Sequence, residues 1–366
     1  MKRLCISASV ILGTLTSSIT FGDEQKAGKV NVCDLANALK LAVKEREGLT
    51  GLSLRISRSG KLLFQGAEGL YPGGKHKFEV NSPARIASMT KPITATAAAV
   101  LVDQGKIKFE DTIDKHLPAF SKIELTKGGK PDRIPTIAEC LSHTAGFRSV
   151  TMSRLPKDSA AFTGDNAAVF AELLELGLAT EPGTKFAYTK LGYDVVAAII
   201  EEKTGKRFED ALRELLLDPL GMSQTGFRLS DALSDAEIKV KSKEIKYFNP
   251  AGGLLSTPDD LTKFYMLHLT GGKVAGKQFI DRKILEQMYR PQPAAPNYGI
   301  GFNVSNPDGD GVAQRIRHGG ASGTIGWADR KTGIIFIGLS QNGSKIAKPV
   351  WSKLTQLVDE SLQGAE

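Results

Sequence analysis

Apolar and polar side chains alternate near the beginning of the chain in a pattern that predicts a β-hairpin. Residues 52–57 alternate between the two kinds, Ser-Gly at positions 59–60 provides a turn, and residues 61–65 continue as a second strand. Before the hairpin, residues 35–43 repeat apolar side chains every three or four positions, which indicates a helix. Asp34 is in position to cap the N-terminus of that helix.

From residue 88 to about residue 285 the hydrophobic pattern is mainly that of helices. Thr136 and Glu139 form the capping box of a short helix, and Gly205 is in position to end another. Thr257 is a capping residue followed by a first-turn proline, so a further helix is expected to begin there. The other helices predicted from apolar spacing are residues 166–178, 194–203 and 208–216.

After Pro291 the pattern is again that of strands. Strands at both ends of the chain with helices between them predict an α+β fold, in which both ends build one antiparallel sheet with flanking helices. The predicted C-terminal elements are strands at residues 298–304, 324–328 and 334–339, a turn at residues 308–311, and a final helix at residues 350–362.

The length of 366 residues suggests one large domain or two interleaved ones. From the order of elements, residues 34–86 and 290–366 are expected to form an α/β part. Residues 87–289 are expected to form an inserted, mainly helical part. The two parts would act as one catalytic unit with a cleft between them.

Residues 1–22 have the pattern of a secretory signal peptide. Lys2 and Arg3 give a positive start, residues 4–15 are apolar, and Thr20-Phe21-Gly22 offers small residues for cleavage. The apolar run is too short to span a bilayer, so no integral span is expected after its removal; retention as a membrane anchor is the alternative. We therefore expect a secreted or periplasmic protein.

Charge and cysteine content narrow the functions to consider. The net charge is +8, of which Lys2 and Arg3 contribute two, and the basic residues are interspersed, so no nucleic-acid partner is expected. The five histidines are scattered, so neither a metal site nor another cofactor is expected. Cys33 and Cys140 remain after the signal peptide, either as a disulfide or as buried thiols. No pattern indicates the oligomeric state.

The stretch Ser88-Met89-Thr90-Lys91 carries the strongest chemical signal. Ser88 and Lys91 are three positions apart, so they lie on one face of the helix that the apolar residues 92–104 predict. Ser88 would lie at the helix N-terminus, where free N–H groups favour a developing anion. Burial of Lys91 would disfavour its ammonium form and make it a base near neutral pH. A lone Ser-x-x-Lys is more often a helix cap followed by a solvated lysine. A catalytic role for Ser88 therefore requires further catalytic groups elsewhere in the chain.

Two further stretches supply such partners. Tyr188 lies in a polar turn before a predicted helix, where its phenol can project into a cleft; packing beneath the loop is the alternative. His318-Gly319-Gly320 lies at the edge of the C-terminal strands, where small residues allow a substrate to approach the strand closely. The alternative there is a glycine turn with a surface histidine.

With these motifs in this order, the chain resembles the serine β-lactamase and penicillin-binding protein superfamily. The branch is the one that holds class C β-lactamases, D-alanyl-D-alanine carboxypeptidases and related esterases. Ser88-Met89-Thr90-Lys91 is similar to its Ser-x-x-Lys, Tyr188-Thr189-Lys190 to its Tyr-x-Asn, and His318-Gly319-Gly320 to its Lys/His-x-Gly. Residues 141–146 and 252–261 are similar as well, and the resemblance extends from about Leu52 to Asn342.

The resemblance implies catalysis through an acyl-enzyme. Ser88 would attack a carbonyl while Lys91, Tyr188 or both accept its proton, and a nearby Lys91 ammonium would lower the pKa of Tyr188. The backbone N–H groups of Ser88 and Ala321 would hold the oxyanion. His318 would contact a substrate carboxylate or tune Tyr188, and Gly320 would admit the substrate.

Lys190 departs from the pattern of the family. The asparagine at this position hydrogen-bonds the amide carbonyl of the substrate, whereas a lysine can only donate and brings a second ammonium near Lys91, lowering the pKa of both. We expect Lys190 to contact substrate. The change favours an ester or an anionic substrate over a β-lactam amide.

Two other features resemble catalytic groups. Lys331-Thr332-Gly333 spells the Lys-Thr-Gly box of related enzymes, but its place between two apolar strands predicts a turn away from the site, and His318 is preferred. His143 is predicted to be buried and hydrogen-bonded rather than to act as a base.

The predicted function is that of a secreted serine hydrolase acting on esters or small amides. A β-lactamase or D-alanyl-D-alanine carboxypeptidase is the alternative within this class. A catalytically inactive binding module is the alternative of another class, although Ser88, Lys91 and Tyr188 are all present. The expected partner is a small ester, amide or peptide-like substrate.

Overall fold

The computed structural model describes residues 18–21, 31–149, 166–227 and 247–363. Seven strands form one antiparallel sheet in the order β1-β3-β2-β11-β10-β9-β8. Their bounds are β1 Ser18–Phe21, β2 Gly51–Arg58, β3 Lys61–Gly69, β8 Asn303–Pro307, β9 Ala313–Gly320, β10 Thr324–Asp329 and β11 Ile334–Ser340.

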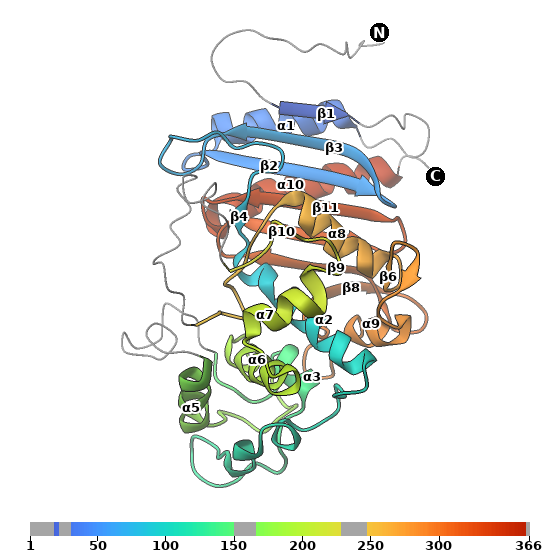
Figure 1. Ribbon diagram of the computed structural model, residues 1–366. Helices are drawn as coiled ribbons and strands as arrows, with labels where there is room; N and C mark the ends of the chain where they lie inside the picture. Colours follow the sequence, from blue (N-terminus) through green and yellow to red (C-terminus); the bar gives the residue numbers. More distant parts are fainter. Residues whose placement is uncertain (1–17, 22–30, 150–165, 228–246, 364–366) are drawn as a thin grey trace.

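Segments from the two ends of the chain meet in the middle of the sheet. Strand β2 pairs with β11, with Ile56 opposite Phe336, so the blue and red strands of Figure 1 lie side by side. This confirms the predicted α+β fold with one antiparallel sheet built from both ends. The hairpin is confirmed too, since β2 and β3 pair across a turn in which Ser59 and Gly60 have positive φ.

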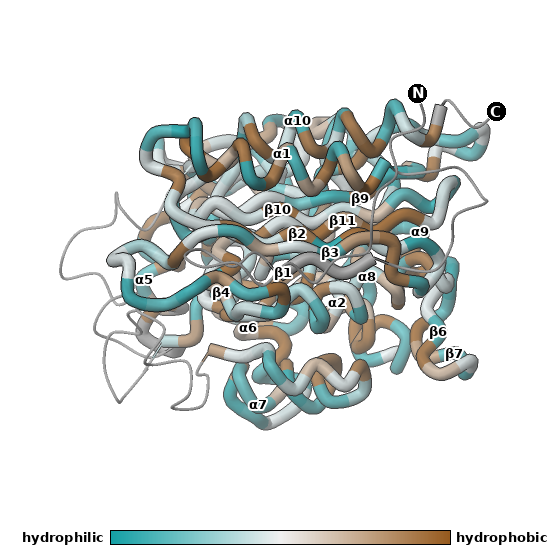
Figure 2. Tube along the Cα trace, turned by 90° about the horizontal axis from the view of Figure 1, so that it is seen from above, coloured by the Kyte–Doolittle hydropathy of each residue, from teal (hydrophilic) through white to brown (hydrophobic). Residues whose placement is uncertain are grey.

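Helices cover both faces of the sheet, as the view in Figure 2 shows. On one face, α1 (Val32–Glu45) and α10 (Ser344–Gln363) enclose a core that includes the inward-facing Leu52, Leu54 and Ile56 of β2. On the other face, α8 (Pro258–Leu269) packs on β10, β11 and β2. Because strand side chains alternate between faces, Ile335 and Ile337 of β11 enter this second core.

The second core extends into the helical region, and α2 (Thr90–Asp103) crosses its centre. Alanine and threonine occupy half of α2, which allows neighbouring helices to pack closely. Its side chains from Thr90 to Leu101 are all buried. The other helices here are α3 Ile137–Leu141, α5 Asn166–Leu176, α6 Leu191–Thr204, α7 Phe208–Leu212 with its continuation η5 Arg213–Leu217, and α9 Arg282–Met288. The short strands are β4 Ala84–Arg85, β5 Leu255–Ser256, β6 Lys273–Val274 and β7 Lys277–Gln278.

Several local predictions are confirmed and others need correction. The Thr136–Glu139 capping box and the left-handed Gly205 cap are both present. Asp34 is not the N-cap of α1, because Asn31 accepts the Asp34 N–H and Asp34 lies in the first turn.

The C-terminal segment begins its strand later than predicted. Gly301 has φ +85°, which bends the chain after Tyr298, so the strand begins only at Asn303. The sequence pattern did not predict strand β9, because its apolar and polar residues do not alternate clearly. It also did not predict the first two turns of α10.

Cys140 is a free and buried thiol, so the predicted alternative of a Cys33–Cys140 disulfide is wrong. Within the described ranges, no helix is long and apolar enough to cross a bilayer.

Candidate active site

Ser88 lies in a single 3₁₀ turn, η1 (Ala87–Met89), directly before α2. The preceding residue, Ala87, has φ +45°, a left-handed conformation that a side chain disfavours and that turns the chain sharply into the helix. Lys91 follows in the first turn of α2, and its Nζ lies 3.2 Å from Ser88 Oγ and 2.8 Å from the carbonyl oxygen of Ala251. The predicted pairing of hydroxyl and amine on one helix face is present.

Lys91 is only 3% exposed, and this burial sets its charge. Burial lowers the pKa of Lys91 from 10.5 to about 7, because an ammonium loses hydration inside the protein. Asp194 opposes this lowering of the pKa, and Lys190 adds to it. At neutral pH a substantial share of Lys91 is therefore the free amine, which can accept the proton of Ser88.

Tyr188 reaches the same place from the turn before α6. Its ring centroid lies 4.8 Å from Lys91 Nζ. Burial raises the pKa of Tyr188, and the hydrogen bond with Ser88 only partly opposes this. The expectation of a lowered Tyr188 pKa is therefore wrong, because loss of hydration raises this pKa more than the hydrogen bond with Ser88 lowers it. Of the two candidate bases, Lys91 is the one that titrates near neutrality.

Lys190 lies at the N-terminus of α6, and its ammonium is paired inside the protein. Its Nζ donates to the Asp194 carboxylate one helical turn further on, and Tyr247 donates its hydroxyl to the other oxygen of Asp194 at 2.5 Å. Lys190 and Asp194 are each 6% exposed. The predicted substrate contact of Lys190 thus competes with a buried ion pair. Asp194 was not singled out in the sequence, although its i, i+4 spacing from Lys190 was a usable signal.

His318 on β9 belongs to a buried network of rings centred on Tyr298. Its Nδ1 lies 2.8 Å from the Gly319 carbonyl oxygen, which can only accept, so Nδ1 carries the proton and Nε2 accepts from Tyr298 at 3.1 Å. Burial, and to a lesser extent Lys91, lowers the pKa of His318 to about 3. His318 is therefore neutral at physiological pH, with both ring nitrogens in use.

His143 completes this network. It is 2% exposed, its Nδ1 accepts the Thr189 N–H at 3.2 Å, and its Nε2 lies 3.2 Å from the Tyr298 hydroxyl. Burial lowers the pKa of His143 well below its ordinary value. These contacts match the structural role predicted for His143. Tyr298 itself was predicted only as a strand residue.

The end of β9 approaches Ser88 closely. Strand β8 pairs with β9 no further than Arg317, so β9 has a free edge from His318 onward. A Cβ on Gly320 would lie 2.3 Å from the Ile86 carbonyl oxygen, so only glycine lets the strand pass this close to η1. The Ala321 N–H has no backbone acceptor in the described part of the chain, which suits the predicted oxyanion hole.

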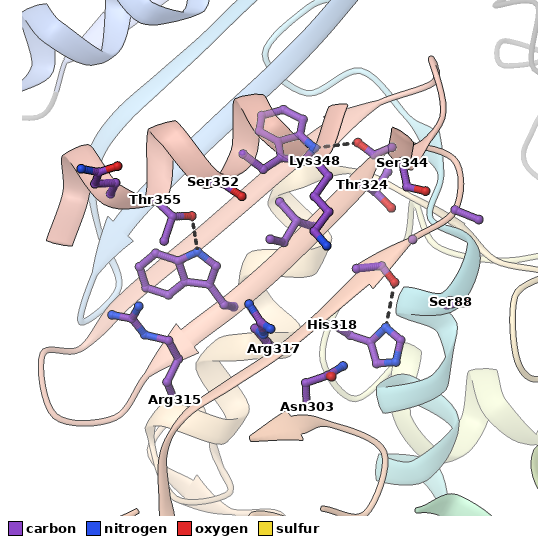
Figure 3. A pocket seen from close by; sticks show the side chains of 18 of the residues that line it. Ser88, Asn303, Arg315, Arg317, His318, Thr324, Ser344, Lys348, Ser352 and Thr355 are labelled. Atoms are coloured by element: carbon purple, nitrogen blue, oxygen red, sulfur yellow. Dashed lines mark hydrogen bonds between the residues drawn. The ribbon is translucent and has the colours of Figure 1, made fainter. Parts of the chain in front are cut away.

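A cavity of about 730 Å³ begins at Ser88 and Tyr188 and passes His318, Gly320 and Ala321. Figure 3 shows Ser88 at the helix end beside His318, with the sheet and α10 forming the rest of the cavity. Lys190 does not line this cavity. Among the residues that the structure describes, no group of three His, Cys, Asp or Glu side chains could hold a metal ion.

Lys331-Thr332-Gly333 lies in the turn between β10 and β11, as predicted. The N–H groups of Lys331 and Thr332 donate to Asp329 Oδ1, and Gly333 has φ +73°. This segment does not line the cavity at Ser88.

Sequence comparison relates this chain to a known family and to characterised relatives. A family profile described as "Beta-lactamase" matches residues 38–349. The D-alanyl-D-alanine-carboxypeptidase/endopeptidase AmpH of Escherichia coli (strain K12) is 25% identical over 237 residues, which cover 61% of this chain and 58% of AmpH. Esterase EstB of Burkholderia gladioli is 29% identical over 202 residues, covering 51% and 49%.

The fold is also that of solved structures. EstCE1, described as a hydrolase with promiscuous acyltransferase activity, superposes with a TM-score of 0.73 at 19% identity, covering 91% of this chain and 100% of EstCE1. At this identity the similarity supports the fold.

Proposed function

Because the chain belongs to the beta-lactamase family and is a serine hydrolase of that family, we propose that it is secreted and cleaves esters or small amides through an acyl-enzyme. The observation that carries the proposal is the 3.2 Å contact between Ser88 Oγ and the Nζ of Lys91, a buried amine whose pKa is about 7. A nucleophile paired with a base that is neutral at working pH is the requirement for acyl transfer.

The mechanism proceeds in two stages. Ser88 Oγ attacks the carbonyl carbon as Lys91 takes its proton, and the N–H groups of Ser88 and Ala321 hold the oxyanion. Lys91 then returns the proton to the leaving oxygen or nitrogen, and the acyl-enzyme remains. Water attacks the acyl carbon by the same proton transfers in reverse order, which releases the acid and restores Ser88. Tyr188, hydrogen-bonded to Ser88, stays protonated and assists the transfer.

An ester is favoured over a β-lactam because of Lys190. Its ammonium is paired with Asp194, so it is not available to replace the asparagine that would recognise an amide carbonyl. The alternative of a β-lactamase or D-alanyl-D-alanine carboxypeptidase is kept because of the similarity to AmpH. An inactive binding module is disfavoured, because Lys91 contacts both Ser88 and Tyr188, and these two line one cavity.

The test is hydrolysis of p-nitrophenyl acetate and of nitrocefin by the wild type, Ser88→Ala and Ser121→Ala. We expect ester turnover by the wild type, a loss of about 10⁴-fold or more in Ser88→Ala, and no change in Ser121→Ala, whose hydroxyl is exposed. Nitrocefin turnover instead would support the β-lactamase alternative. Equal ester turnover by wild type and Ser88→Ala would exclude Ser88 as the nucleophile.

A further inference from the structure

The cavity at Ser88 continues well beyond the reacting groups. It passes the free edge of β9 and continues between α10 and the face of the sheet that α1 and α10 cover. Arg315, Arg317 and Gly319 line it at alternate positions of β9, and Ile325 and Trp327 line it from β10. Ser344, Lys348 and Ser352 line it at four-residue spacing, which places them on one face of α10. We call this extension the α10 groove.

The positive charges of the α10 groove differ in how they are compensated. Arg315 forms ion pairs with Asp329 and Asp359 and lies over the Trp327 ring, so its charge is satisfied. Glu360, at the far end, accepts a hydrogen bond from Gln356. Arg317 and Lys348 are both exposed and form no ion pair with a residue that the structure describes.

The two uncompensated cations face a common space. Figure 3 shows Lys348 extending from α10 over the sheet, while Arg317 and Asn303 project from β9 and β8 into the same groove, beside His318 and Ser88. Asn303 pairs with Arg317 across the two strands, so the two side chains are on the same face of the sheet. Ile325, which is half-buried, lines the same cavity and pairs with Gly319 on β9. A chain with an apolar middle and an anionic end fits this order of contacts.

His318 is not available to bind an anionic group of the substrate. The sequence favours an ester or an anionic substrate, and it offers His318 either as the partner of a substrate carboxylate or as a group that tunes Tyr188. Both ring nitrogens of His318 are already hydrogen-bonded within the protein, and the ring lies 3% exposed. An ionic contact to an anionic substrate must therefore come from other residues. Arg317 and Lys348 line the cavity and have no ion-pair partner in the described part of the chain.

We propose that Arg317 and Lys348 bind an anionic group of the substrate, such as a carboxylate, at a distance from the scissile carbonyl. The guanidinium of Arg317 matches a carboxylate in a two-bond geometry, and Lys348 adds a point charge from the opposite wall. The proposal rests on the proposed esterase function and names its preferred substrates as anionic esters. The anionic group belongs to the acyl part or to the alcohol part, and the experiment distinguishes the two.

The experiment compares kcat/KM for ester pairs that differ in charge. The acyl pair is mono-p-nitrophenyl adipate and its methyl ester; shorter hemiesters are avoided, because their own carboxylate attacks the ester. The alcohol pair is 4-acetoxybenzoate and its methyl ester. The variants are Arg317→Gln, Lys348→Gln and the double variant, with Lys353→Gln as the control, since Lys353 is exposed on α10 outside the cavity.

We expect the wild type to prefer the anionic member of one pair. Each single variant should reduce kcat/KM for that member by about 10-fold, the usual effect of losing a charge-assisted hydrogen bond. The neutral member should change less than about twofold, and Lys353→Gln should change neither. Added salt should reduce the wild-type preference, because both cations are exposed.

Binding to Ser88→Ala separates this proposal from the proposed function. Calorimetry would measure the affinity of the anionic esters for Ser88→Ala, with and without the Arg317→Gln and Lys348→Gln changes. A loss of about 10-fold in affinity would support the α10 groove even if no ester is turned over. Two results would overturn the proposal. One is a double variant whose ratio of kcat/KM for the anionic ester to kcat/KM for the neutral ester equals that of the wild type. The other is an unchanged affinity for the anionic esters when the two changes are made in Ser88→Ala.

Discussion

At the scale of single residues, the charge of Lys91 is determined by its surroundings more than by its position in the sequence. Burial lowers its pKa, and two further buried charges act in opposite directions: Asp194 raises the pKa and Lys190 lowers it. Lys190 and Asp194 contact each other, and the effect of Asp194 on the pKa of Lys91 is the larger of the two, so it opposes that of Lys190. A lysine at position 190 is therefore compatible with Lys91 as a base.

This arrangement predicts opposite pH shifts in two variants. The wild-type kcat/KM should rise with pH through about 7, as Lys91 loses its proton. Asp194→Asn removes the charge that raises the pKa of Lys91, so the rise should move to lower pH. Lys190→Met removes the charge that lowers it, so the rise should move to higher pH. The measurement is the pH profile of p-nitrophenyl acetate hydrolysis for each variant.

Stability provides the control for these two variants. Each single change leaves one buried charge unpaired and should cost about 3–5 kcal/mol in unfolding free energy. The double variant Lys190→Met, Asp194→Asn removes both charges and should be more stable than either single variant. Shifts of the pH profile in the same direction for both single variants would contradict the assigned roles.

At the scale of elements, the site depends on how closely β9 passes η1. A Cβ on Gly320 would lie 2.2 Å from Thr324 Oγ1 and 2.3 Å from the Ile86 carbonyl oxygen, whereas a Cβ on Gly319 would meet nothing nearer than 3.6 Å. The two neighbouring glycines therefore have different reasons to be present. Gly320 permits the packing of strand against turn, and Gly319 lines the cavity.

Gly320→Ala should push β9 away from η1 and so displace Ala321 relative to Ser88. We expect a cost of about 1–3 kcal/mol in unfolding free energy, the usual effect of overpacking, together with a loss of ester turnover. Gly319→Ala, the matched control, should unfold at nearly the wild-type denaturant concentration. Equal stability of the two variants would show that β9 can shift without cost.

At the scale of the whole molecule, one sheet separates two hydrophobic cores, and the site lies where the sheet meets the helical region. The first core joins the sheet to α1 and α10, and the second joins it to α8 and α2. η1 packs against β9 and β10, which places Ser88 at this boundary. The division into an α/β part and a helical part with a cleft between them stays a prediction.

Residues 1–22, the predicted signal peptide, include strand β1, which pairs with β3 at the edge of the sheet. Removal of the signal would remove β1 and leave β3 as the edge strand. We expect the full-length protein, when produced in a bacterium that exports it, to lose about the first 22 residues. Intact-mass measurement of the periplasmic or secreted protein tests this. A protein that keeps Met1 and remains with the cytoplasm would contradict secretion.

Features that depend on neighbouring residues follow from the amino-acid sequence alone. The hairpin, the capping box and the pairing of Ser88 with Lys91 follow from turn chemistry, from capping and from the period of a helix, all of which act over a few positions. The order of strands and helices likewise predicted the α+β fold. The family motifs predict that Tyr188 and His318 lie near Ser88.

Properties that arise between distant segments depend on how the chain packs in three dimensions. Desolvation raises the pKa of Tyr188 and makes His318 neutral, and it depends on what the rest of the chain packs around each group. Tyr247 meets Asp194, and Tyr298 joins His318 to His143, through contacts that no local pattern encodes. The α10 groove exists because the last helix packs over a strand near the site. Arg317 and Lys348 are therefore brought to one groove by tertiary packing and not by any local pattern.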